Sequence, residues 1–252
     1  MYFDQSEYTI RCEWGPEGLH QLAPISDVLI IVDVFSFTTS VDVAVSRGAW
    51  VYPYGWKDES LLAFASSVGA IPAIASRRDP EGLSLSPSSL LRLQTGQKIV
   101  LASPNGAALS VAAGEIPTFA GCLRNADAVA AAAVQAAAAR GGNRISVIPA
   151  GERWKDGTLR PGLEDRLGAG AILQRLPAEA RSPEAEAAIA VFAHFRGRLE
   201  ETLAACSSGK ECADRGPAED VRLAAALNAS PYAPQLIQGA YQSQAKAAAS
   251  IG

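Results

Sequence analysis

The sequence contains few of the residues and motifs on which several common enzyme chemistries depend. Its 252 residues include two histidines, one methionine and four cysteines without CxxC spacing. The HExxH, GxSxG, GxGxxG and GxxxxGK[ST] motifs do not occur. These absences argue against a zinc protease, a serine hydrolase with a nucleophile elbow, and a dinucleotide or P-loop site.

Long apolar runs and an excess of positive charge are also missing. No 18 consecutive residues are apolar, and 22 Lys and Arg against 26 Asp and Glu give a formal net charge of −4. Neither a membrane span nor a nucleic-acid surface is therefore expected. The first residues, MYFDQSEYTI, lack a cationic stretch followed by an apolar one. We expect a cytoplasmic globular protein, and 48% hydrophobic residues are enough for a sizeable core.

Short apolar segments alternate with helical ones along most of the chain. The clearest is DVLIIVDV at 27–34, whose continuous apolar run is typical of a parallel strand buried on both faces. Further strands are predicted at 49–55, 71–75, 98–102, 116–121 and 144–151, with edge strands at 8–14 and 234–239.

Helices are predicted between these strands and after them. The predicted helices cover 36–48, 58–69, the residues after 106, 126–140, 163–176, 182–205 and 218–227. This alternation predicts an α/β fold, a three-layer α/β/α sandwich around a mostly parallel, mixed sheet. We expect a single domain over 1–252, in which 182–252 form a C-terminal helical and edge-strand portion. The one long connection, 77–97, is a candidate functional loop.

Asp33 is the most informative single residue, because it ends an apolar strand. Ligands of open α/β sheets gather at the carboxyl ends of the strands. A carboxylate in such a position needs a cation or hydrogen-bond donors to offset the loss of solvation. Asp33 is therefore either a Mg²⁺ ligand or nucleophile, or an acceptor of backbone N–H groups in the next turn.

Two polar segments follow strands at the same predicted rim. Hydroxyl residues from Ser36 to Ser40 open a helix, where they favour a phosphate or simply cap the helix and pack on the sheet. In SPNG, Asn105 and Gly106 are predicted to adopt positive φ and form an anion-binding nest, or a plain turn.

An acidic pair and several arginines complete the candidate residues. Glu164 and Asp165 lie in the first turn of a predicted helix, where acids complement the helix dipole but also suit Mg²⁺. Arg77, Arg78 and Arg153 are available for an acidic substrate, although surface arginines usually face solvent.

Taken together, these segments resemble the 2-phosphosulfolactate phosphatase family from about Val28 to about Gly239. The order and spacing of the matching segments carry the resemblance. They are IIVDVFSFTTSVDVAVSRGA, ASRRDPEGLSLSPSSL, VLASPNGAAL, GCLRNADAVA, AGERWKDGTLRPGLEDRLGAGAIL and, in the C-terminal region, SSGKECADRGPAEDVRLAAALNASPYAPQL.

The resemblance implies a Mg²⁺-dependent phosphatase that converts 2-phosphosulfolactate to sulfolactate and phosphate on the route to coenzyme M. It also implies a homodimer. Three positions depart from the family pattern: Ser36 replaces an arginine, Leu85 an asparagine and Ala107 a threonine. The residues at the family's motif positions are Asp33, Ser103, Asn105, Gly106, Glu164 and Asp165.

We therefore predict a Mg²⁺-dependent phosphomonoester hydrolase that acts on a small anionic 2-phospho acid. The alternative is a non-catalytic protein that binds phosphate or sulfonate metabolites on the same fold; a third reading is an enzyme of this fold with other chemistry on an acidic metabolite. Asp33 is the predicted catalytic residue, and the predicted metal ligands are Asp33, Glu164 and Asp165. The predicted substrate-binding residues are Ser36, Arg77, Arg78, Ser103, Asn105, Gly106 and Asn125.

Overall fold

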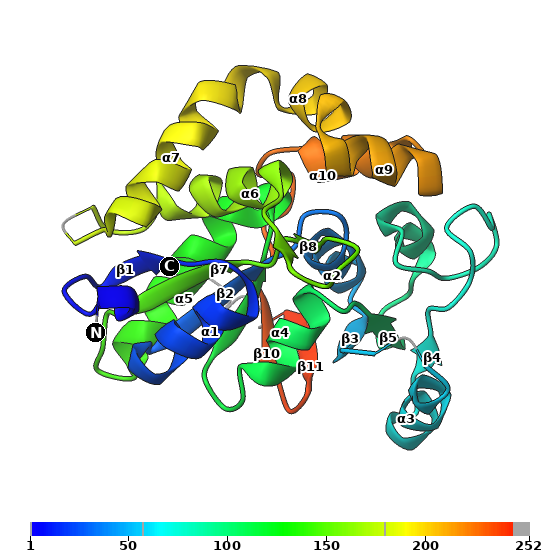
Figure 1. Ribbon diagram of the computed structural model, residues 1–252. Coiled ribbons are helices and arrows are strands. Elements are labelled where there is room, and N and C mark those ends of the chain that lie inside the picture. The colour runs from blue at the N-terminus through cyan, green and yellow to red at the C-terminus, as the bar shows by residue number, and fades with distance from the viewer. Residues whose placement is uncertain (1, 57, 179, 244–252) are drawn as a thin grey trace, which may run out of the picture.

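A mixed nine-stranded sheet forms the centre of the protein (Figure 1). The computed structural model describes residues 2–56, 58–178 and 180–243, so the last residues of the predicted domain lie outside the described part. The strand order is β1-β7-β2-β6-β10-β11-β3-β5-β4. The strands are β1 (Ile10–Cys12), β2 (Val28–Val32), β3 (Trp50–Tyr54), β4 (Ile71–Pro72), β5 (Lys98–Ala102), β6 (Thr118–Gly121), β7 (Ile145–Pro149), β10 (Pro234–Ile237) and β11 (Ala240–Ser243).

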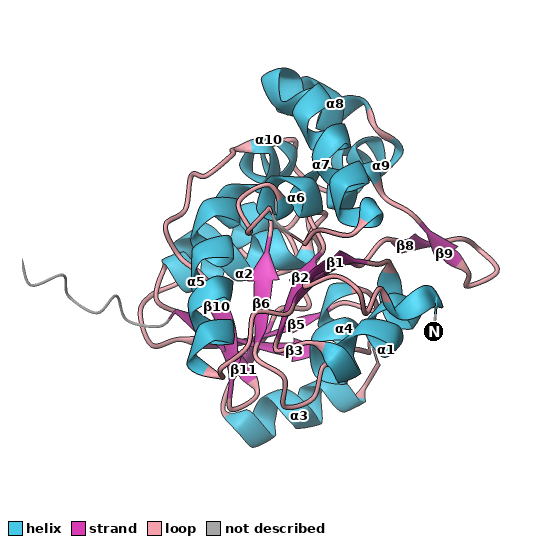
Figure 2. Ribbon diagram, turned by 90° about the vertical axis from the view of Figure 1, so that its left-hand side faces the viewer, coloured by secondary structure: helices cyan, strands magenta, loops and turns pink. Residues whose placement is uncertain are grey.

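Helices cover both faces of this sheet (Figure 2). At β2, α5 and α6 pack on one face and α1 and α4 on the other; at β3 and β5, α2 and α3 pack on opposite faces. The predicted three-layer α/β/α sandwich around a mostly parallel sheet is therefore confirmed. These helices are α1 (Gly15–Leu22), α2 (Phe37–Ser46), α3 (Ser60–Val68), α4 (Gly106–Ala112), α5 (Ala126–Ala139) and α6 (Leu163–Leu173).

Strand β2 shows why the apolar segment at 27–34 forms a central strand. All five of its residues are buried, and it pairs in parallel with both β6 and β7. Side chains alternate between the faces of a strand. Val28, Ile30 and Val32 accordingly pack toward α5 and α6, whereas Leu29 and Ile31 pack toward α1 and α4. The strand thus fixes Asp33 at its carboxyl end.

The segment 234–239 was predicted as an edge strand, and this is wrong. Strand β10 lies inside the sheet, between β6 and β11. Gln238 (φ 51°) and Gly239 (φ 82°) form a two-residue turn that makes β10 and β11 a hairpin. Positive φ at both turn residues is typical of a type I′ hairpin. The hairpin pairs with β6 through β10 and with β3 through β11. It thereby joins the parallel strands β1, β7, β2 and β6 to the parallel strands β3, β5 and β4.

The C-terminal helices also differ from the predicted single helix over 182–205. Helix α7 (Pro183–Phe195) ends before a 3₁₀ turn at Arg196–Arg198, and α8 (Leu199–Ala205) follows. Gly197 lies in this turn, and glycine is a poor helix former. Helix α9 (Ser207–Arg215) continues through Gly209, and α10 (Glu219–Ala225) follows it. A small hairpin of β8 (Glu152–Arg153) and β9 (Leu159–Arg160) projects after β7.

None of the helices in residues 2–56, 58–178 and 180–243 combines the length and apolar character needed to cross a membrane.

Close packing of α6 against α7 predicts a strong effect of one added methyl group. A Cβ atom at Gly170 would lie 2.2 Å from the carbonyl oxygen of Ala188, a backbone atom that cannot move aside cheaply. We expect Gly170→Ala to lower the free energy of unfolding by about 1–3 kcal/mol. Urea unfolding followed by circular dichroism measures this.

The matched control is Gly197→Ala, because a Cβ atom there would contact nothing within 4 Å. Its effect should stay within about 0.5 kcal/mol. Equal stability of the two variants would contradict the proposed packing.

Candidate active site

The carboxylate of Asp33 connects the ends of two strands from different parallel groups. Its Oδ1 accepts the N–H of Phe37 at 3.2 Å, and its Oδ2 accepts the N–H of Gly106 at 2.8 Å. The Ser103 hydroxyl also donates to Oδ2, at 3.3 Å. Thr38 Oγ1 accepts the Asp33 N–H and donates to the Asp33 carbonyl oxygen, which fixes the loop backbone. Asp33 is 4% exposed, and these donors replace its lost hydration.

Gly106 is required at this contact because of its size. A Cβ atom at this position would lie 2.7 Å from Asp33 Oδ2 and 2.6 Å from the Phe37 ring. The predicted positive φ at Asn105 and Gly106 is wrong: Asn105 has φ −104° and Gly106 begins α4. The Gly106 amide does face an anion, but that anion is the protein's own carboxylate.

Asp165 makes a second link between strand ends. It lies in the first turn of α6, where its Oδ1 accepts the N–H of Val34 at 2.7 Å. Its Oδ2 accepts the N–H of Gly151 at 2.8 Å. The carboxylate thus joins the residues after β2 to those after β7, and it brings Asp33 and α6 together.

Two glutamates lie beside these aspartates. Glu164, 2% exposed, precedes Asp165, and the Cys206 thiol lies 3.9 Å from its Oε2. Glu152 begins β8 and its Oε2 accepts the side-chain N–H of Asn105 at 2.9 Å. We call Asp33, Glu152, Glu164 and Asp165 the acid cluster.

The four carboxyl groups of the acid cluster repel one another. Burial is the largest cause that raises the pKa of each group. The charge of Glu164 raises the pKa of Asp33 further, and the charges of Glu164 and Asp33 raise the pKa of Asp165. The charge of Asp33 also raises the pKa of Glu152, and the charge of Glu152 raises the pKa of Glu164. The four groups therefore share one electrostatic environment, in which negative charge exceeds its compensation.

The predicted arginines divide between the site and the surface. Arg77 Nη1 donates to the Ser36 hydroxyl at 2.8 Å, so a guanidinium reaches the buried loop between Asp33 and α2. Ser36 does not cap α2 through its side chain, although a cap was one of its predicted roles. Arg78 is exposed and donates to the carbonyl oxygen of Asp214. Both arginines line a groove of about 680 Å³ between the 77–92 segment and the residues after α9.

Asn125 is placed differently from the other predicted site residues. It is buried, its Oδ1 accepts the N–H of Cys122 at 2.8 Å, and its Nδ2 donates to the carbonyl oxygen of Ala120 at 3.2 Å. These hydrogen bonds stay within its own turn and do not reach the acid cluster.

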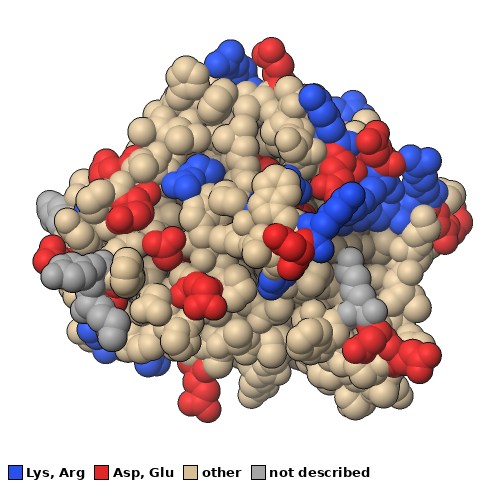
Figure 3. All heavy atoms as spheres, in the orientation of Figure 1, with Lys and Arg blue, Asp and Glu red and all other residues tan. Residues whose placement is uncertain are grey.

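Sequence reasoning missed several residues that approach the acid cluster from the β8–β9 hairpin and from α9. Arg160 donates to the Ser208 hydroxyl at 3.4 Å and to Glu211 Oε2 at 3.2 Å, and its charge lowers the pKa of Glu164 against the effect of burial. Figure 3 shows charged side chains of both signs crowded over α9 and the β8–β9 hairpin. The position of Glu152 directly after a predicted strand could have identified it as a site residue. No sequence pattern marks Arg160 or Ser208.

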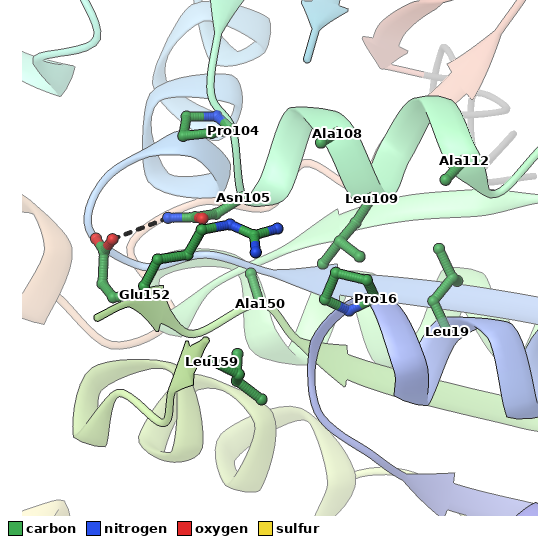
Figure 4. Close-up of a pocket in the computed structure, with 11 residues that line it drawn as sticks. Pro16, Leu19, Pro104, Asn105, Ala108, Leu109, Ala112, Ala150, Glu152 and Leu159 are labelled. Carbon is green, nitrogen blue, oxygen red and sulfur yellow. Dashed lines mark hydrogen bonds between the residues drawn. The ribbon is translucent and has the colours of Figure 1, made fainter. Parts of the chain in front are cut away.

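A cavity of about 170 Å³ adjoins the acid cluster (Figure 4). Asn105, Glu152 and Arg153, one of the predicted arginines, supply its polar side chains. Apolar side chains from α1 and α4, among them Leu19 and Leu109, form most of the remaining wall. The site therefore combines a strongly acidic centre with an adjoining space whose wall is mostly apolar but includes the charged side chains of Glu152 and Arg153.

The acid cluster is suited to a hard cation by its chemistry, but it is not a preformed cage. In the described part of the chain, no three His, Cys, Asp or Glu side chains are grouped so that they could hold a metal ion. Mg²⁺ is commonly bound by one or two carboxylates together with substrate phosphate and water. A carboxylate has about four lone-pair sites, so Asp33 and Asp165 still have acceptor capacity.

Removal of one charge from the acid cluster should make the free energy of unfolding less sensitive to rising pH. The pKa of Glu164 in the folded protein lies above its ordinary value of 4.5. At pH values between the ordinary pKa and the pKa in the folded protein, the folded state binds more protons than the unfolded state. The free energy of unfolding therefore falls as the pH rises through this range. Each pKa unit of difference between the states corresponds to about 1.4 kcal/mol. Glu164→Gln should reduce this fall and stabilise the protein at neutral pH.

Urea unfolding between about pH 5 and about pH 8 measures how steeply the free energy of unfolding changes with pH. Glu200→Gln is the matched control, because Glu200 is exposed on α8. An unchanged slope in the Glu164 variant would show that the charge of this residue is already compensated.

Comparison with known proteins identifies a family. The family described as 2-phosphosulpholactate phosphatase matches residues 15–239, and its name implies a phosphoric monoester hydrolase with a phospho-acid substrate. A search of curated proteins found no match to the chain. The family match covers most of the sequence and includes every residue of the acid cluster. The chain belongs to the 2-phosphosulpholactate phosphatase family.

Proposed function

We propose that the protein hydrolyses a small anionic 2-phospho acid at the acid cluster with the help of Mg²⁺. The observation that carries this proposal is the convergence of Asp33, Glu164 and Asp165 on one buried region, despite their separation in the sequence. The family's own substrate, 2-phosphosulfolactate, is the first compound to test, and its product sulfolactate would connect the protein to coenzyme M synthesis.

The mutual repulsion of the acid cluster supports a role for a divalent cation. Buried carboxylates that raise one another's pKa are stabilised by any cation that binds among them. We assign Asp33, Glu164 and Asp165 as the residues that would hold Mg²⁺, one or two of them at a time. When bound, the ion would supply a Lewis acid that neutralises charge on the phosphoryl oxygens.

The hydrogen bonds of Asp33 favour a ligand role over a nucleophilic one. Three donors, from Phe37, Gly106 and Ser103, disperse the negative charge of its two oxygens. Such donors stabilise the carboxylate and reduce its tendency to attack phosphorus. We therefore propose that water attacks phosphorus while Asp33 orients the site, and a trapped aspartyl phosphate would overturn this assignment.

Arg77 is the best placed cation for the substrate's anionic groups. Its guanidinium lies 2.8 Å from the hydroxyl of Ser36, the position at which the family pattern has an arginine. Arginine suits phosphate and carboxylate because its N–H groups form paired hydrogen bonds. We propose that Arg77 supplies from the 77–97 segment the positive charge that residue 36 lacks, and that Ser103, Asn105 and Gly106 shape the floor of the site.

Phosphate release from 2-phosphosulfolactate and 2-phospholactate tests the proposed reaction. Purified protein should release inorganic phosphate in the presence of Mg²⁺, and EDTA should abolish the release until Mg²⁺ is restored. Saturable binding without release from either compound would instead favour a non-catalytic binding protein.

Asp33→Asn should lower kcat by about two orders of magnitude or more, because it removes the charge at the centre of the site. Thermal unfolding must accompany the assay, since an amide at this position would set an N–H group against backbone donors. The matched control is Asp127→Asn, an exposed α5 residue paired with Arg175. Near-normal turnover by the Asp33 variant would refute its assigned role.

A further inference from the structure

Glu152 lies between the acid cluster and the cavity, and the reaction proposed above gives it no role. Of the four acids in the cluster, it is the one that lines the cavity (Figure 4). Its side chain is half-buried, so the carboxyl group is partly accessible. The preceding residue, Gly151, donates its backbone N–H to Asp165 Oδ2 at 2.8 Å. Strand β8 therefore begins at the edge of the acid cluster.

A chain of three hydrogen bonds connects Glu152 to Asp33. Glu152 Oε2 accepts the side-chain N–H of Asn105 at 2.9 Å. The backbone N–H of Asn105 donates to Ser103 Oγ at 3.2 Å, and the Ser103 hydroxyl donates to Asp33 Oδ2 at 3.3 Å. The turn that carries Ser103 and Asn105 thus has Asp33 at one end and Glu152 at the other. A phospho acid whose phosphoryl group lies at Asp33 can extend past Glu152 into the cavity.

Glu152 differs from the two aspartates in how its oxygens are held. Both oxygens of Asp33 and both oxygens of Asp165 accept backbone N–H groups, which favour the ionised carboxylate. In the described part of the chain, the hydrogen bond to Glu152 is made at Oε2, which leaves Oε1 to carry a proton. Burial, and after it the charge of Asp33, raise the pKa of Glu152 above its ordinary value, so its protonated form persists to higher pH.

A proton donor is valuable here because an alkoxide is a poor leaving group. Negative charge develops on the leaving oxygen as its bond to phosphorus breaks. A well-placed general acid accelerates such a step by about 10²–10⁴-fold. The carboxyl groups of the acid cluster would repel this developing charge, which makes its neutralisation by a proton more favourable still.

We propose that Glu152 is the general acid of the reaction and donates a proton from Oε1 to the ester oxygen of the departing 2-hydroxy acid. The proposal rests on the proposed function. Water forms a bond to phosphorus, the bond between phosphorus and the ester oxygen breaks, and its electron pair takes up the Glu152 proton. The attacking water releases one proton, which restores the acid. The products are the 2-hydroxy acid and inorganic phosphate.

Two esters that differ in the basicity of the leaving oxygen test the proposal. They are 2-phospholactate and 3,3,3-trifluoro-2-phospholactate, whose fluorine atoms withdraw electrons and stabilise the departing alkoxide. In single-turnover phosphate release with Mg²⁺, Glu152→Gln should slow the reaction of 2-phospholactate by about 10²-fold or more. The loss for the trifluoro ester should be smaller by roughly tenfold, because its leaving oxygen needs the proton less. Glutamine can still accept the Asn105 N–H, so the variant removes the proton and keeps the hydrogen bond.

The matched control is Glu17→Gln, because Glu17 is exposed on α1, the helix that borders the same cavity. This variant should hydrolyse both esters at the wild-type rate. Melting temperatures of both variants report whether they fold. Equal losses on the two esters in the Glu152 variant, or no loss on 2-phospholactate, would overturn the proposal.

The wild-type protein provides a measurement that does not depend on the folding of a variant. With the acid in place, its rates on the two esters should agree within about tenfold, and a larger advantage of the trifluoro ester would contradict the proposal. No phosphate release from either ester would overturn the proposed function and this proposal with it. Release by the wild type, with equal losses in the Glu152 variant, would overturn the role of Glu152 alone.

Discussion

The site depends on the hydrogen bonds that the buried Asp33 carboxylate receives. A buried carboxylate without donors would be strongly unfavourable, and here backbone N–H groups of Phe37 and Gly106 supply them. These bonds also have a structural effect, because they attach the end of β5 to the end of β2. Five strand steps separate the two strands in the sheet order β2-β6-β10-β11-β3-β5, and the usual twist adds up to roughly 100° over that distance. The carboxylate is therefore both the centre of the site and the joint between two halves of the sheet.

Hydrogen bonds stabilise individual carboxylates of the acid cluster, whereas repulsion between their charges destabilises the cluster as a whole. Each aspartate has enough backbone donors to be accommodated singly, but the charge of Glu164 raises the pKa of Asp33, and the charges of Glu164 and Asp33 raise that of Asp165. Such a conflict is typical of functional sites, where charge is arranged for a ligand and not for the stability of the free protein. A divalent cation accompanied by a phosphoryl group would resolve it.

Much of the fold could be predicted because it depends on hydrophobic patterns within short segments of the sequence. The apolar run around β2 and the strand–helix alternation indicated the three layers, and Asp33 and Glu164 were found as acids at strand and helix ends. The internal position of β10 could not be predicted, because it depends on a Gln238–Gly239 turn and on distant pairing with β6. Arg160 was missed because it lies in the short β8–β9 hairpin, which no motif marks, although its charge lowers the pKa of Glu164.

The central claim is that these separate carboxylates act together on one divalent ion. Crystals grown with Mn²⁺ and inorganic phosphate, measured at the manganese absorption edge, test it most directly. The account predicts one anomalous peak beside Asp33 and Glu164, at about 2.1–2.2 Å from carboxylate oxygen, with phosphate in the same coordination shell. Bound phosphate with no manganese at these residues, or manganese only at a distant surface site, would contradict it.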